Sequence, residues 1–379
     1  MNFELTPDQK LLVDTVTQFV RKDSPVARFR ALREDPLGYS RDVWRQMGEL
    51  GWLGVSLPEE AGGFGGSFVE SMLILQQFGT TLVPEPYVPS VILAGTALAR
   101  AGSPAQLEEW LSPMLAGQTS LALAYGGEKN RGRAAESPVL AQRSGAGYRL
   151  SGEARWVLNG HGADQVVVSA RAPEGPTLFV VPRTAPGLRV TPVRTIDGQH
   201  AATLAFGDVE VPEESRLGAP GSAGPLLEDL VDLGAAAACA EGLGVMERML
   251  RLTVEYLNTR VQFGVKIGVF QALQHRAVDM FVATELAKSM AIMAAIRVGD
   301  PDVGERRYAV SAAKVQLAQS GRFVSQQAIQ LHGGIGITDE HDIGLYFKRL
   351  HALGVLFGDE EHHVERFSHL PVFTAGLGG

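Results

Sequence analysis

The sequence predicts an α+β protein with a helical N-terminal domain (residues 1–117), a middle antiparallel β domain (118–217) and a C-terminal four-helix bundle (225–379). Three observations support this fold class. Apolar residues recur at helical spacing at both ends of the chain, short strand-like runs alternate with Gly and Pro in the middle, and a Gly/Pro/Ser linker precedes the last part. A length of 379 residues suits two or three domains.

Composition excludes several classes of function. The net charge is −8 and no basic run is present, so we expect no nucleic-acid partner. A single cysteine, Cys239, cannot form an internal disulfide and fits a reducing compartment. The N-terminus lacks the features of a signal peptide, and no uncharged apolar run reaches ~18 residues. We therefore expect a cytoplasmic protein without a membrane span.

The N-terminal part opens with a helix start signal. Thr6 and Gln9 form a capping box around a proline at the first helical position, and further helical patterns cover 68–79 and 88–101. The glycine-rich run within 51–67 admits two interpretations, a phosphate loop or a tight helix-to-helix connection. No strand precedes it and no lysine follows it, which favours the connection.

The middle part contains short runs rich in Val, Leu, Phe and Thr, roughly ten residues apart. They read LALAY, VLAQ, YRLSG, QVVVSA, TLFVV, LRVTPV and ATLAF. Trp156 lies among them and on periodicity alone is a core aromatic residue of a β-sheet.

The C-terminal part contains four long helical patterns and a short tail helix. The long patterns cover about 225–257, 271–298, 304–331 and 339–357. This number suits an antiparallel four-helix bundle.

Two stretches interrupt these helices. In the first, Tyr256 and Arg260 are four residues apart and so share a helix face, and Phe263 follows. Arginine carries a rigid fork of donors suited to a phosphate or carboxylate. In the second, Gln330 is followed by a glycine cluster at 333–336, where a backbone can approach a ligand closely.

These stretches resemble the acyl-CoA dehydrogenase family of flavoproteins, whose patterns are Tyr-x-x-x-Arg-x-x-Phe-Gly, then Ile-Gly and Phe-Gln, and later Gln-x-x-Gly-Gly-x-Gly. The order of helices, β domain and helices resembles the family from end to end. The resemblance implies FAD as cofactor, with Arg260 and Gln330 at its diphosphate region. The cofactor contacts implied are Arg260, Phe263, Gln271, Gln330, Gly333, Gly334 and Trp156.

The resemblance also implies an activity and partners. The activity is FAD-dependent α,β-dehydrogenation of an acyl-CoA thioester to the 2-enoyl-CoA. The partners are the acyl-CoA substrate, an electron-transferring flavoprotein as acceptor, and further subunits in a homodimer, a homotetramer or a heterotetramer with a related chain. In these assemblies the Gln330 cluster reaches the flavin of a neighbouring subunit.

The catalytic base is where the sequence departs from the family. The two positions that carry a glutamate in relatives are Phe357 and Gly234 here. Glu241 lies two helical turns after Gly234 among small apolar residues, so it is either the base or a glutamate held by a neighbouring helix end or arginine. Asp359 is either a second candidate base or the cap of the tail helix.

Two further features bear on the function. His362 and His363 lack a third ligand and are expected at the surface, so we expect no metal site. The threonine that relatives place two residues after the tryptophan at position 156 is Leu158, which weakens the usual flavin-ring contacts.

Three hypotheses follow. The chain is a dehydrogenase that uses Glu241, or a non-catalytic subunit that completes the flavin site of a related chain, or an offshoot with flavin oxidase or monooxygenase chemistry. The second hypothesis rests on a resemblance to base-poor subunits of actinobacterial and proteobacterial type, from heteromeric dehydrogenases of steroid side chains or other bulky acyl-CoAs.

Overall fold

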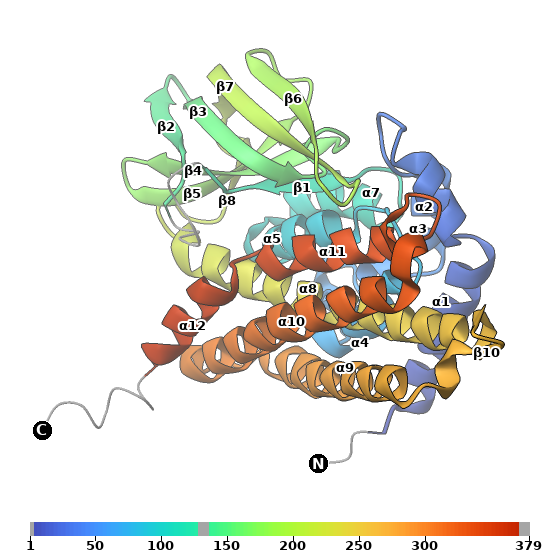
Figure 1. Ribbon diagram of the computed structural model, residues 1–379. Helices are drawn as coiled ribbons and strands as arrows, with labels where there is room; N and C mark the ends of the chain where they lie inside the picture. The colour runs from blue at the N-terminus through green and yellow to red at the C-terminus, as the bar shows by residue number, and fades with distance from the viewer. Residues whose placement is uncertain (1–3, 128–135, 371–379) are drawn as a thin grey trace, which may run out of the picture. The chain divides into compact units, whose positions relative to one another are not determined.

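A computed structural model describes residues 4–127 and 136–370 (Figure 1). The chain forms two compact units that do not follow chain order. The sheet unit comprises residues 32–67 and 84–234, and the bundle unit comprises residues 1–31, 68–83 and 235–379. Each unit therefore takes helices from the N-terminal part, and the boundary between them falls within one long helix. The three consecutive domains expected from the sequence stay a prediction.

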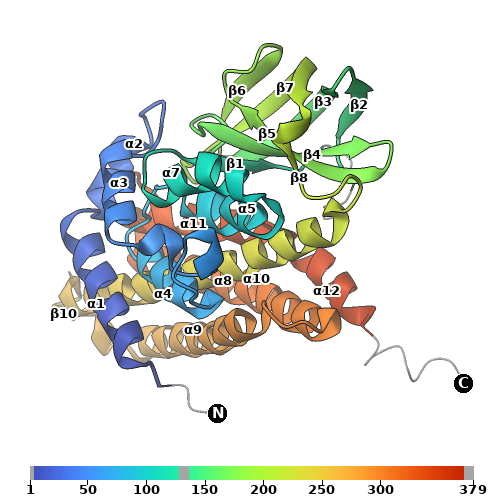
Figure 2. The same cartoon turned by 180° about the vertical axis from the view of Figure 1, so that it is seen from behind.

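The sheet unit is built on one eight-stranded sheet in the order β6-β7-β3-β2-β4-β5-β8, with β1 on β4 (Figures 1 and 2). The strand-like runs of the sequence all became strands. They are β1 (Leu121–Ala124), β2 (Val139–Ser144), β3 (Gly147–Leu158), β4 (Gln165–Ala172), β5 (Gly175–Pro182), β6 (Leu188–Arg194), β7 (His200–Pro212) and the short β8 (Arg216–Leu217).

Strand direction differs from the expectation in two places. The pairs β2–β3, β4–β5 and β6–β7 are joined by short turns and are antiparallel, as predicted. The pairs β1–β4 and β2–β4 are parallel. Parallel neighbours need a longer connection, and the alternation of apolar residues does not encode the direction of a neighbouring strand.

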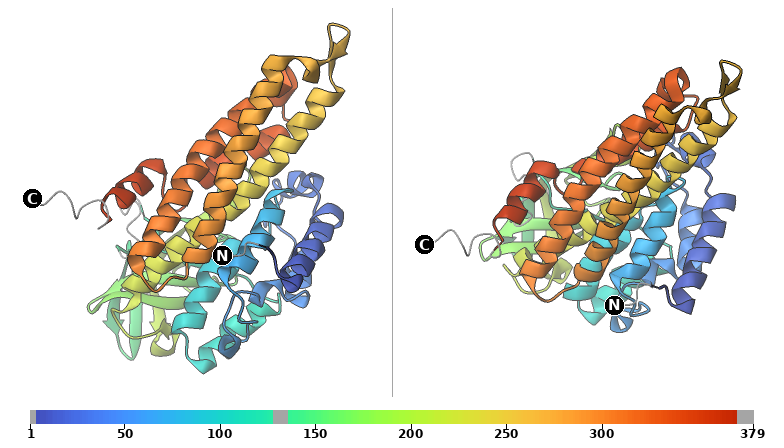
Figure 3. Two further views of the ribbon diagram at one scale, coloured as in Figure 1. Left: turned by 90° about the horizontal axis from the view of Figure 1, so that it is seen from below. Right: turned by 60° about the horizontal axis from the view of Figure 1, so that its bottom comes forward.

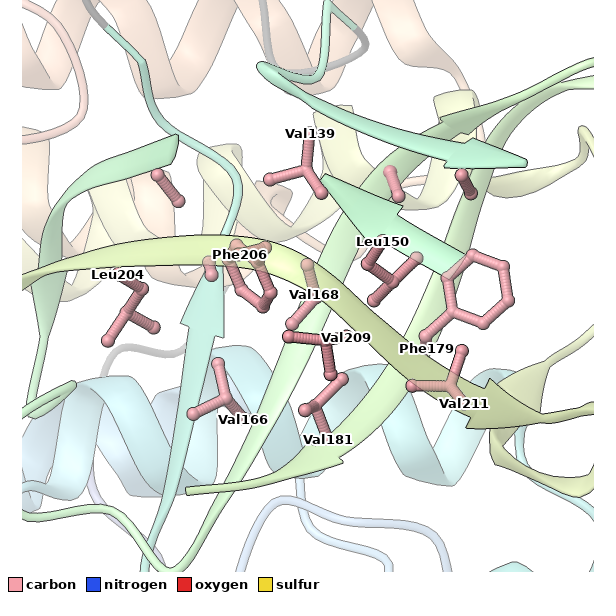
Figure 4. Packing of buried hydrophobic residues seen from close by; sticks show 14 of the residues in the cluster. Val139, Leu150, Val166, Val168, Phe179, Val181, Leu204, Phe206, Val209 and Val211 are labelled. Atoms are coloured by element: carbon pink, nitrogen blue, oxygen red, sulfur yellow. The ribbon is translucent and has the colours of Figure 1, made fainter. Parts of the chain in front are cut away.

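Apolar side chains from the strands fill the core of this unit (Figure 4). Tyr148 and Phe179 meet edge to face, with ring centroids 4.8 Å apart. The buried cluster takes alternate residues of the strands, including Val139, Leu150, Val166, Val168, Val181, Leu204, Phe206, Val209 and Val211. The apolar runs that predicted the strands thus supply the core through their alternate residues.

Helices of the sheet unit precede and flank the sheet. They are α3 (Arg41–Glu49), η1 (Trp52–Gly54), η2 (Glu59–Ala61), the π-helical η3 (Val88–Gly95) and η4 (Leu107–Leu111), α5 (Thr96–Ala101), α6 (Pro104–Gln106), α7 (Ser112–Leu115) and η5 (Glu213–Ser215). The glycine-rich run at 51–67 is closed by its own backbone hydrogen bonds. The donors are the N–H groups of Gly63, Phe64, Gly65 and Gly66, and the acceptors are carbonyls of residues 54–58. Those donors are not free for a phosphate, so the helix-to-helix connection is the correct interpretation.

The bundle unit consists of long helices that run side by side (Figure 3). They are α8 (Ala223–Thr259), α9 (Gln271–Arg297), α10 (Val303–His332) and α11 (Ile343–Val355), followed by α12 (Glu360–Ser368). The helices α1 (Pro7–Lys22), α2 (Val26–Leu32, across the boundary) and α4 (Phe68–Gly79) belong to the N-terminal part. The capping box at Thr6 and Gln9 is present, and so is the predicted set of bundle helices. None of the described helices has the length and apolarity needed to cross a membrane.

Glycines bring α4 and α8 unusually close. A Cβ added at Gly244 of α8 would lie 1.8 Å from the carbonyl oxygen of Gln76, and one added at Gly79 of α4 would lie 2.2 Å from the carbonyl oxygen of Glu241. Real Cβ atoms do not approach backbone so closely, so glycine is the residue that this crossing requires.

Candidate functional site

A β-hairpin follows the end of α8 and was not expected from the sequence. Its strands are β9 (Val261–Gln262) and β10 (Val265–Lys266), joined by Phe263 and Gly264. Both turn residues have positive φ, 53° and 77°, which is the pattern of a two-residue type I′ turn. Phenylalanine is an unfavourable residue there, and such strain concentrates at functional positions. The ring of Phe263 is 90% exposed and contacts Phe270 edge to face.

Arg260 lies between α8 and this hairpin. Its N–H donates to the carbonyl of Tyr256 and its carbonyl accepts from the N–H of Ile267, both at 2.9 Å, so its backbone is fixed from both sides. The side chain is exposed. Within residues 4–127 and 136–370, no carboxylate pairs with its guanidinium. The donor fork is therefore available to an anionic ligand.

The second glycine stretch forms the end of α10. Gln330 is exposed, and its carbonyl accepts from the N–H of Gly333, which has φ 62° and closes the helix. A Cβ added at Gly333 or Gly334 would meet nothing within 4 Å, so open space lies beside this backbone. The next turn, η7, covers Gly333–Ile337.

An aromatic stack joins the two stretches. The rings of Tyr256 and His332 lie 4.7 Å apart at 25°. Tyr256 is one helical turn before Arg260, and His332 lies between Gln330 and Gly333. The stack therefore brings the end of α8 close to the end of α10. We use the name anion corner for five residues at these two ends and on the hairpin: Arg260, Phe263, Gln330, Gly333 and Gly334.

Two other predicted ligand contacts lie outside the anion corner. Gln271 is the first residue of α9 and is exposed. Trp156 belongs to the sheet unit, on β3, with φ 56° and a side chain 65% exposed. It lies where the β3–β7 register shifts between Ala154 and Val157. A bulge of this kind re-aims a side chain, so the alternative of a buried core tryptophan is wrong.

Glu241 is held by an arginine. It is 6% exposed, and its Oε1 and Oε2 accept from Nε and Nη2 of Arg349 on α11 at 2.6 and 2.8 Å. This is the bidentate geometry of a strong carboxylate–guanidinium pair. Of the two interpretations left open by the sequence, the structure has the one in which a neighbouring arginine binds the carboxylate.

Asp359 caps a helix. Its Oδ1 accepts from the backbone N–H of His362 at 2.9 Å, which makes it the N-cap of α12. The capping role allowed by the sequence is thus present, and it commits one carboxylate oxygen to the backbone.

Phe357, which the family resemblance aligns with a glutamate position, is 7% exposed and has φ 60°. Two buried side chains fix the turn around it. Lys314 Nζ donates to the carbonyls of Leu353, Gly354 and Leu356 at 2.7, 3.3 and 2.7 Å. His363 donates from Nε2 to the carbonyl of Phe357 at 3.1 Å.

Sequence reasoning missed both side chains, and for His363 it was wrong, because that residue is 1% exposed rather than at the surface. A lysine amid small apolar residues at helical spacing was the signal for Lys314. For His363 the amphipathic pattern of α12 gave no signal, since its neighbours are polar.

Comparison with known proteins shows which family the chain belongs to. Residues 6–118 match the acyl-CoA dehydrogenase N-terminal domain and residues 226–368 match the acyl-CoA dehydrogenase C-terminal domain. The chain belongs to the acyl-CoA dehydrogenase family. The anion corner fits the cofactor of this family, FAD, because it combines an arginine fork that no carboxylate of the described residues binds, an exposed aromatic ring and open glycine backbone, which are suited to a dinucleotide diphosphate.

Individual relatives agree with this assignment. The acyl-CoA dehydrogenase FadE27 of Mycobacterium tuberculosis is 31% identical over 91% of both chains. The ChsE4–ChsE5 complex from the same organism contains a chain that is 30% identical, with a TM-score of 0.89 and coverage of 97% of this chain and 98% of that one. A Tcur3481–Tcur3483 steroid ACAD is also 30% identical, with a TM-score of 0.86 and the same coverage.

These findings confirm the expected fold, the flavoprotein oxidoreductase family and FAD as its cofactor. The predicted roles of individual residues, the acceptor, the assembly and the cytoplasmic location stay predictions.

Proposed function

We propose that this chain is the base-poor subunit of a heteromeric, FAD-dependent acyl-CoA dehydrogenase that converts an acyl-CoA thioester to its 2-enoyl-CoA. One observation carries the proposal. The anion corner is open, whereas the two candidate carboxylates are engaged, Glu241 by Arg349 and Asp359 by the start of α12. A chain with this combination can hold cofactor but needs a base from elsewhere.

The chemistry requires two hydrogens to leave the substrate. A carboxylate removes the α-proton, and FAD, when bound, supplies the acceptor for the β-hydrogen as hydride. In the proposal the carboxylate belongs to a related partner chain. The relatives support this assembly, since the ChsE4–ChsE5 and Tcur3481–Tcur3483 proteins each carry two chain names, and the latter is called a steroid ACAD. We extend the substrate class to bulky acyl-CoAs of this kind, with an electron-transferring flavoprotein as acceptor.

In this proposal the residues of the chain bind and orient the cofactor. The Arg260 fork would bind the diphosphate, the Gln330 amide would donate to the cofactor, and Gly333 and Gly334 would let the backbone approach it. The exposed ring of Phe263 would shield the cofactor from water. Gln271 and Trp156 remain proposed contacts of the adenine or flavin ends. Arg260 and Gln330 would act across the subunit interface, on cofactor held mainly by the partner.

The surface proposed for that partner shares Phe263 with the anion corner. Large apolar side chains are exposed along the hairpin and the outer side of α9. They are Val261, Phe263, Val265, Val269 and Phe270, then Val278, Phe281, Val282 and Leu286. The latter four recur at helical spacing along one side of α9, which is the arrangement of a packed helix face.

The alternative is a homomeric dehydrogenase in which Glu241 is the base. It requires the Arg349 pair to open during turnover, and the bidentate geometry opposes that. The base would also lie about 10 Å along α8 from the Gly234 position.

The test is to purify the chain alone and co-expressed with related subunits, and to measure bound flavin by its visible absorption and its bleaching by a panel of acyl-CoAs. The proposal expects full flavin content and bleaching with a partner that carries a glutamate at the position equivalent to Phe357. Bleaching by the chain alone, abolished by Glu241→Gln, would overturn it in favour of the homomeric alternative. Oxygen consumption without an acceptor would instead indicate oxidase chemistry.

Arg260→Ala provides the residue-level test, with Arg251→Ala as matched control because Arg251 is an exposed arginine earlier on α8. We expect Arg260→Ala to lower FAD occupancy while leaving the fold intact, and Arg251→Ala to leave FAD occupancy unchanged. Equal FAD affinity in both variants would exclude Arg260 from the site.

A further inference from the structure

His332 lies at the centre of a three-ring stack beneath the anion corner. Tyr256 from α8 covers one side of it, and His341, from the loop after η7, lies 4.7 Å away at 56°. The stack joins three separate segments of the bundle unit: the end of α8, the end of α10 and residues 338–342. Aromatic contacts of this kind have defined geometry, so they fix the orientation of the segments that carry them.

The hydrogen bonds of His332 define its protonation. It is 2% exposed, and Nδ1–H donates to the carbonyl of Ala328 at 2.8 Å, one turn earlier in α10. Nε2 is buried and has no hydrogen-bond partner among the described residues. A second proton on Nε2 would therefore create a buried cation and a donor without an acceptor. The geometry allows the neutral imidazole alone.

Charged side chains of both signs lie near the three-ring stack. His341 accepts at Nδ1 from the N–H of Ile343 at 3.1 Å, which leaves its other nitrogen protonated in the neutral form. Arg30 of α2 binds Asp342 at 2.8 Å and also bonds Asp339, so it holds the same loop. Tyr256 adds no charge from α8.

Both histidines resist protonation. Burial lowers the pKa of His332, and the neighbouring His341 lowers it further, against the bond to Ala328. Burial also lowers the pKa of His341, where Asp342 acts in the opposite direction and Arg30 in the same one. Acid pH therefore places charge on this stack at a cost to the folded arrangement.

We propose that neutral His332 is a positioning residue of the anion corner, which fixes Arg260 and the Gly333 turn relative to each other through its ring and loses this hold when it is protonated. The proposal rests on the proposed function for the identity of the ligand. It predicts that cofactor retention falls in acid before the chain unfolds.

The test compares His332→Ala, which removes the ring, with His332→Phe, which keeps a ring without a titratable nitrogen. His275→Phe on α9 is the matched control, because His275 is exposed. Two quantities are measured from about pH 8 down to the lowest pH at which the chain stays folded, because burial moves the titration of His332 below the ordinary histidine range. They are the FAD dissociation constant of the chain with its partner subunit, and the hydrogen exchange of backbone amides 333–338 in the chain alone.

We expect His332→Ala to raise the dissociation constant and the exchange rates by about three- to tenfold, the loss expected for one aromatic contact. His332→Phe should match the wild type near neutral pH and lose the acid response. The proposal is overturned if His332→Phe keeps the acid response, or if neither variant changes the exchange of the turn. A chain that binds no FAD with any partner refutes the proposed function instead, and the exchange data then still decide the role of His332.

Discussion

Arg349 and Glu241 form a bidentate ion pair that ties α11 to α8 inside the bundle unit. Both side chains are largely buried, with 14% and 8% of their surface exposed. An uncompensated charge in such a place is costly, whereas a fully paired one contributes modestly. The pair therefore accounts for a buried glutamate among small apolar residues without assigning it a catalytic role.

Breaking this pair on one side should destabilise the protein. Glu241→Gln leaves the Arg349 charge buried with weaker partners, and we expect the free energy of unfolding in urea to fall by about 3 kcal/mol. The double variant Glu241→Gln/Arg349→Met should recover a substantial part of that loss. Additive losses in the double-mutant cycle would argue that the two side chains do not act as a pair. If the paired role is the whole role, flavin reduction by substrate proceeds in the single variant wherever FAD remains bound.

Lys314 is expected to stabilise the C-terminal end of α11. Its ammonium satisfies three carbonyls at the last turn of that helix, where the helix dipole also favours positive charge. Lys314→Met keeps the volume but leaves these acceptors unsatisfied, so we expect a loss on the order of 3 kcal/mol in urea unfolding.

Lys348→Met on the exposed side of α11 is the matched control and should change stability by less than about 0.5 kcal/mol. A similar loss in both variants would show that the carbonyl contacts of Lys314 are not what stabilises the turn.

His363 should make stability depend on pH. Burial, with added repulsion from Lys314 and His362, lowers its pKa from 6.5 to about 3. Below about pH 6.5 the unfolded chain takes up a proton that the folded chain refuses until about pH 3, so the contribution is complete above 6.5 and is lost as the pH falls. The expected slope is about 1.4 kcal/mol per pH unit in this window.

Urea unfolding at a series of pH values measures this slope. His363→Gln should flatten it, whereas His275→Gln, at an exposed site, should not. An unchanged slope in His363→Gln would mean that other groups carry the acid sensitivity.

The features that the sequence predicted are those with local causes. The capping box at Thr6 and the apolar run around Val166 depend on neighbours a few residues away. The fixed spacing from Tyr256 to Arg260 and Phe263 indicated the family. The missed features depend on partners far along the chain: Arg349 is 108 residues from Glu241, and Lys314 is 39 or more from the carbonyls it binds. The hairpin at Phe263 was missed because its turn places a phenylalanine where glycine or asparagine is usual.

Replacing Gly244 or Gly334 with alanine should have different effects on stability. At Gly244 the added methyl would collide with the carbonyl oxygen of Gln76 at 1.8 Å, and because the obstacle is backbone the helices must separate. We expect Gly244→Ala to lower the free energy of unfolding by about 3 kcal/mol or more. At Gly334 the methyl meets nothing within 4 Å, so Gly334→Ala should stay within about 1 kcal/mol of the wild type in free energy of unfolding.

For FAD binding we expect the opposite order of effects for the two substitutions. The same open space at Gly334 is where the proposed diphosphate approaches the backbone, so Gly334→Ala should weaken FAD binding while Gly244→Ala, once folded, should not. Urea unfolding and FAD titration of both variants with the partner subunit separate the two effects, and a Gly334→Ala variant with wild-type FAD affinity would place the ligand elsewhere.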